Sequence, residues 1–408
     1  EQCRILILKA NDKMAFAKVM EVLHSSAQRM GVDCPNFPRC GGCTYRHMDY
    51  QEELWLKQQR VQDNLKRIGE SSVTVEEILG AEQTEKYRNK AQYPVSVEGR
   101  VGFYRARTHE VIDTPRCLLV KDEANAAAQA VREYMHVCQV AGYHEKSGKG
   151  LIRHLYIRSN VKGESLICLI VNGVALPREE WLVRRLQEAC PGVVGILLCR
   201  NERHDNVILG DQYRVLWGSA YLEDVLCGLT FRLSVPSFYQ VHHDQAERLY
   251  EKAIAFAALS GRETVLDLYC GVGTITLVMA RYAKRVIGAE IVPEAIEDAR
   301  ANAARNGIEN AAFFCADAGA VARRFAEEGF CPDVITVDPP RKGLTQEVID
   351  AMAKMNPQRI VYISCDSATL ARDVKRLAEQ GYCAVRAAAI DMFPRADHVE
   401  CVVLMTKQ

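Results

Sequence analysis

The pattern of apolar and polar positions changes along the chain, from a strand-rich first half to a second half in which helices and strands alternate. After about residue 236, short apolar runs recur with helical segments between most of them, as in a sheet whose strands are connected by helices. We expect strands at 265–269, 285–290, 311–315, 333–337, 359–363, 385–390 and 399–405. This order predicts an α/β fold with a seven-stranded, Rossmann-like sheet.

The preceding residues, 85 to 235, predict a second domain of mixed α and β structure. Strand-like segments occur at 102–104, 151–159, 165–171, 193–199 and 229–235. Apolar side chains at helical spacing from Ala124 to Met135 predict a helix between two of them. Residues 1–30 add two possible strands, 3–8 and 15–23, which are too few for a domain.

A helix is also expected from Asp49, which can cap it, with Glu52 three residues later as in a capping box. Its apolar face carries Leu54, Val61, Leu65 and Ile68. Its basic residues are Lys57, Arg60, Lys66 and Arg67. These cations predict either a solvated surface or a face that contacts phosphates.

Composition limits the class of protein. A chain of 408 residues is long enough for two or three domains, and its 52 basic and 52 acidic residues give a formal net charge of +0. Zero net charge does not exclude nucleic acid, because a local basic patch is sufficient for binding. No run of 18 apolar residues and no apolar signal segment is found, so we expect a cytoplasmic protein without a membrane partner.

The 16 cysteines of such a protein are expected to be mostly buried thiols, with a few that carry chemistry. The strongest local pattern is the loop from Asp33 to Cys43, in which Cys34, Cys40 and Cys43 alternate with two prolines and two glycines. A loop of this composition must be held by something other than secondary structure.

A nucleoside-binding pattern lies at the start of the predicted sheet. The run Thr264 to Leu277 ends a strand in the turn Gly271-x-Gly273 and continues into a helix. Glu290 closes the next strand, roughly 20 residues later, where such folds place a carboxylate that binds ribose hydroxyls. Without the third glycine of the dinucleotide motif, the turn could also be a packing device.

Reactive side chains follow three later strands. Asp338-Pro-Pro-Arg341-Lys342 ends one, Ser364-Cys365-Asp366 ends the next, and His398-Val399-Glu400 begins the last. We expect these side chains to converge at one sheet edge. A cysteine beyond a strand is more often a packing residue than a nucleophile, but a nucleoside site and a nearby carboxylate favour the nucleophile.

Taken in order, the motifs resemble those of bacterial RNA uridine-5-methyltransferases that carry an iron-sulfur cluster, and the resemblance covers nearly the whole chain. The motifs are Cys34-x5-Cys40-Gly-Gly-Cys43 with Cys117, Tyr87-Arg-Asn-Lys90, Gly102-Phe-Tyr104, Ser237-Phe-Tyr-Gln-Val241, Asp267-Leu-Tyr-Cys-Gly-Val-Gly273, Asp338-Pro-Pro-Arg-Lys-Gly343, Ser364-Cys-Asp366, Phe393-Pro394 and His398-Val-Glu400.

The resemblance implies a class I methyltransferase domain at 236–408, a central iron-sulfur and RNA-binding domain at 31–235, and a partial TRAM-like β segment at 1–30. It also implies S-adenosylmethionine contacted by Gln240, Tyr269, Thr274, Glu290, Asp317 and Asp338. Cys365 would be the nucleophile and Glu400 the base. Chemistry supports both roles, because C5 of uracil becomes nucleophilic only after a thiolate adds at C6, and the adduct resolves only when a base removes the C5 proton.

The resemblance further implies that Cys34, Cys40, Cys43 and Cys117 bind a 4Fe-4S cluster that holds an RNA-facing loop. From ligand type alone, zinc and iron-sulfur are equally compatible with four cysteines. The family's iron-sulfur branch favours 23S ribosomal RNA as substrate, with transfer RNA as the alternative. No obligate protein partner is expected.

Three alternatives are weaker. Enzymes that methylate exocyclic amines tend to follow Asp-Pro-Pro with an aromatic residue, whereas Arg341 and Lys342 follow here. A 5-methylcytidine enzyme normally has Pro-Cys, whereas Ser364 precedes Cys365. A non-catalytic RNA-binding factor would not need Cys365 and Glu400.

Candidate RNA contacts, each of which could also be a solvated charge, are Arg88, Lys90, Arg105, Arg107, Arg153, His154, Arg158, Arg341 and Lys342.

Overall fold

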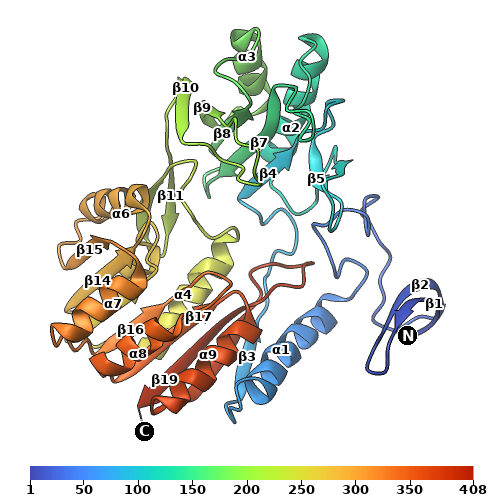
Figure 1. Ribbon diagram of the computed structural model, residues 1–408. Coiled ribbons are helices and arrows are strands. Elements are labelled where there is room, and N and C mark those ends of the chain that lie inside the picture. Colours follow the sequence, from blue (N-terminus) through green and yellow to red (C-terminus); the bar gives the residue numbers. More distant parts are fainter. Residues whose placement is uncertain (408) are drawn as a thin grey trace.

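The computed structural model describes residues 1–407, which form two α/β units on separate sheets and a β-hairpin near the start of the chain (Figure 1). The larger sheet has eight strands in the order β15-β14-β13-β16-β17-β19-β18-β3. Their bounds are β13 Thr264–Leu268, β14 Arg285–Glu290, β15 Ala311–Cys315, β16 Val334–Val337, β17 Arg359–Ser364, β18 Tyr382–Ile390, β19 Glu400–Lys407 and β3 Val75–Leu79.

The seven strands expected after residue 236 are confirmed, and the eighth, β3, was not expected. It pairs in parallel with β18 although it lies in the segment 31–235. The expected boundary at 235/236 therefore does not coincide with the edge of the sheet. The two adjacent carboxylates of β3, Glu76 and Glu77, interrupt the apolar pattern that marks a strand, and they pair with Arg386 and Lys252 instead.

Helices cover both faces of the larger sheet. One face packs against α1 Tyr50–Arg67, α7 Ala318–Glu327, α8 Gln346–Met355 and α9 Ser367–Glu379. The other packs against α4 His243–Ala257, α5 Thr274–Ala280, α6 Pro293–Arg305 and the paired strands β11 Leu222–Leu226 and β12 Leu229–Leu233. Because β14 and β16 flank β13 on opposite sides, the chain reverses direction across the sheet at β13, where open α/β sheets bind ligands.

The central unit is built on a five-stranded sheet in the order β10-β9-β8-β7-β4. Its strands are β4 Lys90–Pro94, β7 Ile152–Ser159, β8 Ser165–Val171, β9 Val193–Arg200 and β10 Gln212–Gly218. Two helices, α2 Asp122–Val137 and α3 Glu179–Ala189, cover one face. A short hairpin of β5 Gly102–Tyr104 and β6 Val111–Asp113 lies beside it. The sequence missed β4 and β10, since β10 is mostly exposed and β4 includes polar residues.

Helix α1 begins as expected, but its capping and its basic face differ from expectation. Asp49 accepts from the Gln51 N–H, whereas its own N–H donates to the Gln28 carbonyl and not to Glu52. Lys57 is neither solvated nor free for a phosphate, because it is 0% exposed. Its ammonium lies 2.7 Å from a carboxylate oxygen of Glu53 and 2.7 Å from one of Asp391. A helical wheel places it three residues after Leu54 and four before Val61, on the buried stripe.

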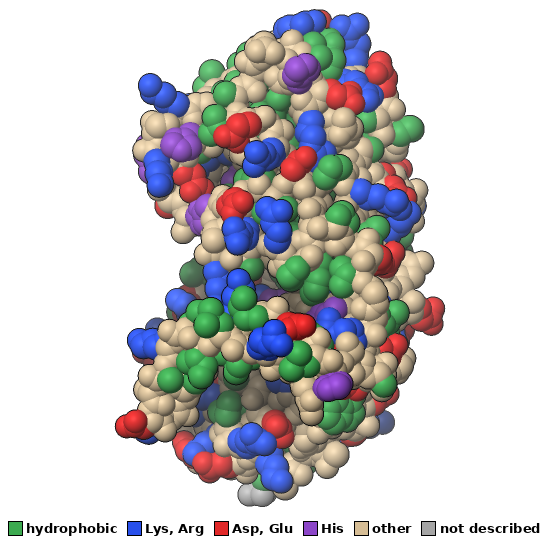
Figure 2. Space-filling model, turned by 90° about the vertical axis from the view of Figure 1, so that its right-hand side faces the viewer, with side chains coloured by type: hydrophobic (Ala, Val, Ile, Leu, Met, Phe, Trp, Pro, Cys, Tyr) green, Lys and Arg blue, Asp and Glu red, His purple; other side chains and the backbone are tan. Residues whose placement is uncertain are grey.

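The first hairpin, β1 Gln2–Ala10 and β2 Ala15–His24, matches the two strands expected within residues 1–30. It carries nine large exposed apolar side chains, which gather on the lower half of the face in Figure 2: Ile5, Leu6, Ile7, Leu8, Met14, Phe16, Val19, Met20 and Leu23. Among the helices of residues 1–407, none has the length and apolar character that crossing a membrane requires.

Candidate active site

Three adjacent strands bring the predicted nucleophile and base together. Cys365 follows β17, and Glu400 is the first residue of β19, which pairs antiparallel with β17. Ser364 is opposite Cys401 in this register, so Cys365 and Glu400 lie side by side at the same strand ends. Asp338 follows β16, the other neighbour of β17.

Burial dominates the electrostatics of this cluster. The Glu400 side chain is only 3% exposed, and burial together with the nearby Asp338 charge raises its pKa to about 8. Burial likewise raises the pKa of Asp338 to about 7. Burial and the Glu400 charge raise the pKa of the Cys365 thiol. A carboxyl that is held near neutrality by burial is suited to proton transfer.

Arg341 supplies the positive charge of the cluster. It acts on both Cys365 and Glu400, and in each case it opposes the rise of pKa caused by burial. Its guanidinium also donates to Nε2 of His398, at 3.2 Å. The sequence suggested Arg341 only as an RNA contact. A nearby cation stabilises a thiolate, and this requirement could have linked Arg341 to Cys365 from the sequence alone.

The segment that leads into Glu400, residues 391–398, is fixed by contacts from distant parts of the chain. Lys57 donates to the Phe393 carbonyl at 3.1 Å as well as to Asp391. The Arg395 carbonyl accepts from the backbone N–H groups of Thr44 and Tyr45, at 2.8 and 3.0 Å. Since Thr44 follows Cys43, the cysteine loop and helix α1 together position the approach to Glu400.

The glycine turn and Glu290 lie together at the end of β13 and β14. One Glu290 oxygen accepts from the Gly271 N–H at 3.2 Å, and the other accepts from Ile291 and Val292 at 2.8 and 3.0 Å. Gly271 and Gly273 have φ of +54° and +82°, which glycine adopts without strain. These residues adjoin a cavity of about 720 Å3 that extends to the central unit, and Gly271 and Glu290 line it.

The other predicted cofactor residues surround the same strand ends. Tyr269 adopts a left-handed φ of +71°, a strained conformation that often marks functional positions. Thr274 begins α5 and hydrogen-bonds Tyr250 at 2.8 Å. Asp317 caps α7, with its carboxylate accepting from Gly319 and Ala320. Gln240 is buried, and its carbonyl accepts from the Asn89 amide at 2.9 Å.

The sequence noted Asp267 only as part of a motif. It is fully buried in β13, and its carboxyl accepts from the Thr276 hydroxyl. Burial raises its pKa to about 8. A carboxyl inside an otherwise apolar strand was the signal that could have singled it out.

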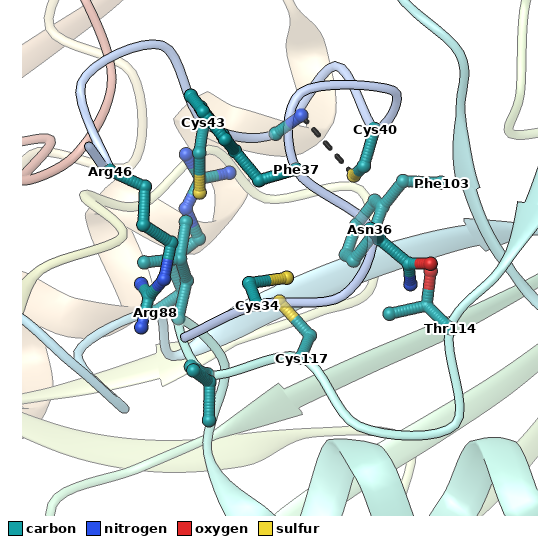
Figure 3. A pocket seen from close by; sticks show the side chains of 13 residues that line it. Cys34, Asn36, Phe37, Cys40, Cys43, Arg46, Arg88, Phe103, Thr114 and Cys117 are labelled. Atoms are coloured by element: carbon teal, nitrogen blue, oxygen red, sulfur yellow. Dashed lines mark hydrogen bonds between the residues drawn. The ribbon is translucent and has the colours of Figure 1, made fainter. Parts of the chain in front are cut away.

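The four predicted metal ligands line one cavity in the central unit (Figure 3). Cys34, Cys40 and Cys43 come from the loop before α1, and Cys117 comes from the segment between β6 and α2. The Gly42 N–H donates to the Cys40 sulfur at 3.4 Å. Burial raises the pKa of Cys43 to about 12 and raises those of Cys40 and Cys117. These thiols would therefore ionise readily only with a cation bound among them.

The cavity between the four cysteines is small, about 30 Å3. Within residues 1–407, no three Cys, His, Asp or Glu side chains converge closely enough to hold one metal ion. The four sulfurs instead occupy the walls of the cavity, and Arg88 lies beside them (Figure 3). The Arg88 charge favours the thiolate forms of Cys40, Cys43 and Cys117.

The nine candidate RNA contacts are dispersed. Arg158 is 1% exposed and donates to the Ser237 carbonyl, so it is a structural residue. Arg105 pairs with Glu110 on the surface. Arg88 faces the cysteine cavity, Arg341 faces Cys365, and Arg153 and His154 line a separate cavity. Lys90 is half-buried beside Arg158, and Arg107 and Lys342 are exposed.

The tRNA (uracil-5-)-methyltransferase family matches residues 49–408. Two relatives, from Clostridium acetobutylicum and Clostridium tetani, are each named as an uncharacterized RNA methyltransferase. The first is 39% identical over 414 residues, which are 100% of this chain and 90% of the relative. The second is 41% identical over 410 residues, 100% of this chain and 89% of the relative.

Among solved structures, the chain is similar to the tRNA (uracil-54, C5)-methyltransferase of Pyrococcus abyssi in complex with S-adenosyl-L-homocysteine. The TM-score is 0.78 at 25% sequence identity, and the match covers 99% of this chain and 92% of that one. The likeness therefore includes both units.

Proposed function

The chain belongs to the tRNA (uracil-5-)-methyltransferase family of S-adenosylmethionine-dependent RNA methyltransferases, and we propose that it methylates C5 of a uridine through a covalent adduct between Cys365 and C6. The observation that carries this proposal is the pairing of Cys365 with a buried Glu400 at adjacent strand ends, beside Arg341.

Each residue has a distinct step. Cys365 adds as thiolate to C6 of the uracil, and the electrons of the C5–C6 double bond move toward the C4 carbonyl oxygen, which makes C5 nucleophilic. S-adenosylmethionine would supply the methyl group: C5 forms a bond to the methyl carbon as the bond from that carbon to the sulfonium sulfur breaks, and S-adenosylhomocysteine leaves as a neutral thioether. Glu400 then takes the C5 proton, the C5–C6 double bond reforms, and Cys365 leaves as thiolate. Arg341 supports the first step and the last, because a nearby cation stabilises the thiolate.

The cofactor is assigned to the ends of β13 and β14, where Glu290, Tyr269, Thr274, Asp317, Gln240 and Asp338 are candidate contacts. The left-handed glycine turn supports this assignment, since it opens the backbone to a ligand. Of these residues, Asp338 also adjoins Glu400. It is therefore suited to contact either the cofactor or the reacting uracil.

We further assign a 4Fe-4S cluster to Cys34, Cys40, Cys43 and Cys117, with a structural role. The cavity shared by the four cysteines and the Arg88 charge, which favours their thiolate forms, support a thiolate-bound metal group, and the family resemblance favours iron-sulfur over zinc. Anaerobically purified protein should contain about four iron and four sulfide per chain, as a cysteine-ligated cubane cluster does. Stoichiometric zinc without iron would contradict the assignment.

For the substrate we propose 23S ribosomal RNA, which the four cysteines and the family resemblance favour. Transfer RNA is the second candidate, because the similar structure from Pyrococcus abyssi is a tRNA enzyme. Mapping 5-methyluridine in both RNAs from a strain without this gene would separate them. Loss of one 23S site supports the proposal, loss of a tRNA site transfers it to tRNA, and an unchanged map contradicts the function.

A further inference from the structure

A second cavity of the central unit lies on the opposite side of the β5–β6 hairpin from the cysteines. Phe103 lines the cysteine cavity, whereas the next residue, Tyr104, lines this one. We call it the histidine cavity, and its residues of interest are Tyr104, His109, Tyr143, Glu145, Arg153 and His154. Its volume of about 390 Å3 lies within the range of small-ligand pockets, about 300–1,000 Å3.

Planar groups form two walls of the histidine cavity. The rings of Tyr104 and His109 are stacked, with centroids 5.0 Å apart and planes inclined by 19°. The Glu145 carboxylate holds Nδ1 of His109 at 2.8 Å. The Arg153 guanidinium lies 4.3 Å from the centroid of the Tyr143 ring, but both residues are buried and Arg153 donates to the Asn201 and Arg203 carbonyls, so they support the wall behind Tyr104 and His109. Tyrosine and imidazole rings are surfaces on which unpaired RNA bases stack.

A buried polar side chain lies deeper in the cavity. His154 is only 9% exposed, and its Nδ1 has no hydrogen-bond partner in the part of the chain that the structure describes. Burial and the neighbouring Arg153 charge lower its pKa to about 4, so the imidazole is neutral near neutral pH. A neutral imidazole presents one donor and one acceptor, which matches the edge of a base.

The charges favour a nucleotide over a free anion or a metal. Glu98, Glu110 and Glu145 balance the cations Arg100, Lys146 and Arg153 among the lining residues. Among the described residues that line this cavity, no three Cys, His, Asp or Glu side chains form a group that could hold a metal ion. At the exposed rim, Arg100 and Lys146 form no ion pair with any described residue, so both are free for a phosphate. Figure 2 shows histidine, basic and acidic side chains interspersed on the upper part of this face.

We propose that the histidine cavity is a second nucleotide site, which receives an unpaired base of the substrate RNA other than the uridine that is methylated. The inference rests on the proposed function, since it takes the ligand from the RNA of the reaction. The site would select among RNAs that present the same target uridine, because only an RNA with a second unpaired base at the correct separation fills both sites.

The first test compares substrates and variants. Tyr104→Ala should raise KM for an unmodified transcript of 23S ribosomal RNA or tRNA by about five- to 150-fold, which is what a stacked base contributes, and leave kcat unchanged. His109→Phe keeps a ring on Tyr104 and should retain most of the affinity. Tyr282→Ala is the control, because Tyr282 is an exposed tyrosine beside Arg281 and lies outside the cavity.

Trimming the RNA completes this test. On a short oligonucleotide that contains the target uridine without its flanking segments, wild type and Tyr104→Ala should have equal KM. Equal KM on the full transcript, or an equal loss on both substrates, would overturn the second site. A loss of kcat would also overturn it, because it would indicate damage to the active site.

The second test does not depend on methylation. The same transcripts, substituted with 4-thiouridine and irradiated on the wild-type protein, should crosslink to peptides that contain Tyr104 or Tyr143. Absence of such peptides, while crosslinks form elsewhere on the protein, would overturn the inference. If neither transcript is methylated, the proposed function fails, yet crosslinks in the histidine cavity would still support a nucleotide site.

Discussion

Two buried carboxylates at the ends of the same connection, Asp391 after β18 and Glu400 at the start of β19, have opposite surroundings. Asp391 is 0% exposed, and its oxygens accept from Lys57 at 2.7 Å and from the Tyr50 hydroxyl at 2.8 Å. Glu400 is 3% exposed, and within residues 1–407 its carboxyl forms neither a hydrogen bond nor an ion pair within 4.0 Å.

The difference separates a structural carboxylate from a reactive one. A buried charge costs free energy unless hydrogen bonds and a counter-ion compensate it, and Asp391 has both. The Glu400 carboxyl has no hydrogen bond within residues 1–407, and the nearby Arg341 charge does not outweigh its burial, so its pKa is raised and its proton affinity is high. Asp391, whose charge is compensated, fixes the segment. In the proposed mechanism Glu400, at the other end of the segment, is available to react with a ligand.

The strongest test of this comparison replaces the two residues that are proposed to react, Cys365 and Glu400. Cys365→Ala should abolish methylation and form no covalent RNA adduct, because no thiolate adds to C6. Glu400→Gln should add and methylate but stall before elimination, and so accumulate a methylated protein–RNA conjugate on denaturing gels. RNA with 5-fluorouridine should trap the wild type in the same way. Normal turnover by Glu400→Gln, or methylation by Cys365→Ala, would refute the assigned roles.

The next test removes Lys57, the cation that compensates Asp391. Lys57→Met leaves the buried Asp391 carboxylate without its cation and leaves Glu53 with only Arg395 at 3.6 Å, which should lower the free energy of unfolding by about 3–5 kcal/mol. Lys66→Met, on the exposed side of the same helix, should change it by at most about 0.5 kcal/mol. Urea titration measures both.

A combined variant sharpens the same point. Lys57→Met together with Glu53→Gln and Asp391→Asn removes the uncompensated charges, and it should recover much of the lost stability. If instead Lys57→Met unfolds like wild type, the buried ion pairs do not contribute as argued. A folded Lys57→Met protein should also release its RNA adduct more slowly, because the segment before Glu400 is less well fixed.

Glu290 is an intermediate case. Backbone N–H groups donate to both of its carboxylate oxygens, but it also lines the cavity next to the proposed cofactor site. Glu290→Ala should weaken S-adenosylmethionine binding by about 1.5–3 kcal/mol, as expected for hydrogen bonds to a charged acceptor. Glu294→Ala is the control, because Glu294 is an exposed carboxylate of the same cleft. Calorimetry that gives equal affinity for wild type and Glu290→Ala would show that the carboxylate does not bind the ribose.

The sequence predicted the proximity of Cys365 and Glu400 but not the contacts of Asp391. Strand ends that share an edge bring Cys365 and Glu400 together, and this rule needs only the order of the strands. The partners of Lys57 cannot be found in this way, because Asp391 is 334 positions away and no local pattern links the two. The apolar runs likewise gave seven strands of the sheet, whereas β3 depends on tertiary pairing with β18.

The dependence on pH should distinguish formation of the RNA adduct from its release. The pKa values of Glu400 and Asp338 are raised to about 8 and about 7, and that of the Cys365 thiol is also raised. Only the deprotonated carboxylate can take the C5 proton. Release of the adduct should therefore increase about tenfold per pH unit below the pKa of Glu400 and level off above it. Formation of the adduct follows the thiolate and should continue to rise beyond that pH.

The free energy of unfolding should depend on pH in the direction opposite to the release of the adduct. In the unfolded chain a glutamate titrates near 4.3, whereas the folded protein holds the Glu400 proton up to about pH 8. Between these values the folded state binds more protons, so the free energy of unfolding falls as pH rises. Glu400→Gln cannot titrate and should flatten this decline, although buried Asp267 retains part of it. Equal slopes for wild type and Glu400→Gln would indicate that Glu400 is already ionised in the folded protein, and would contradict its role as the base that holds a proton near neutral pH.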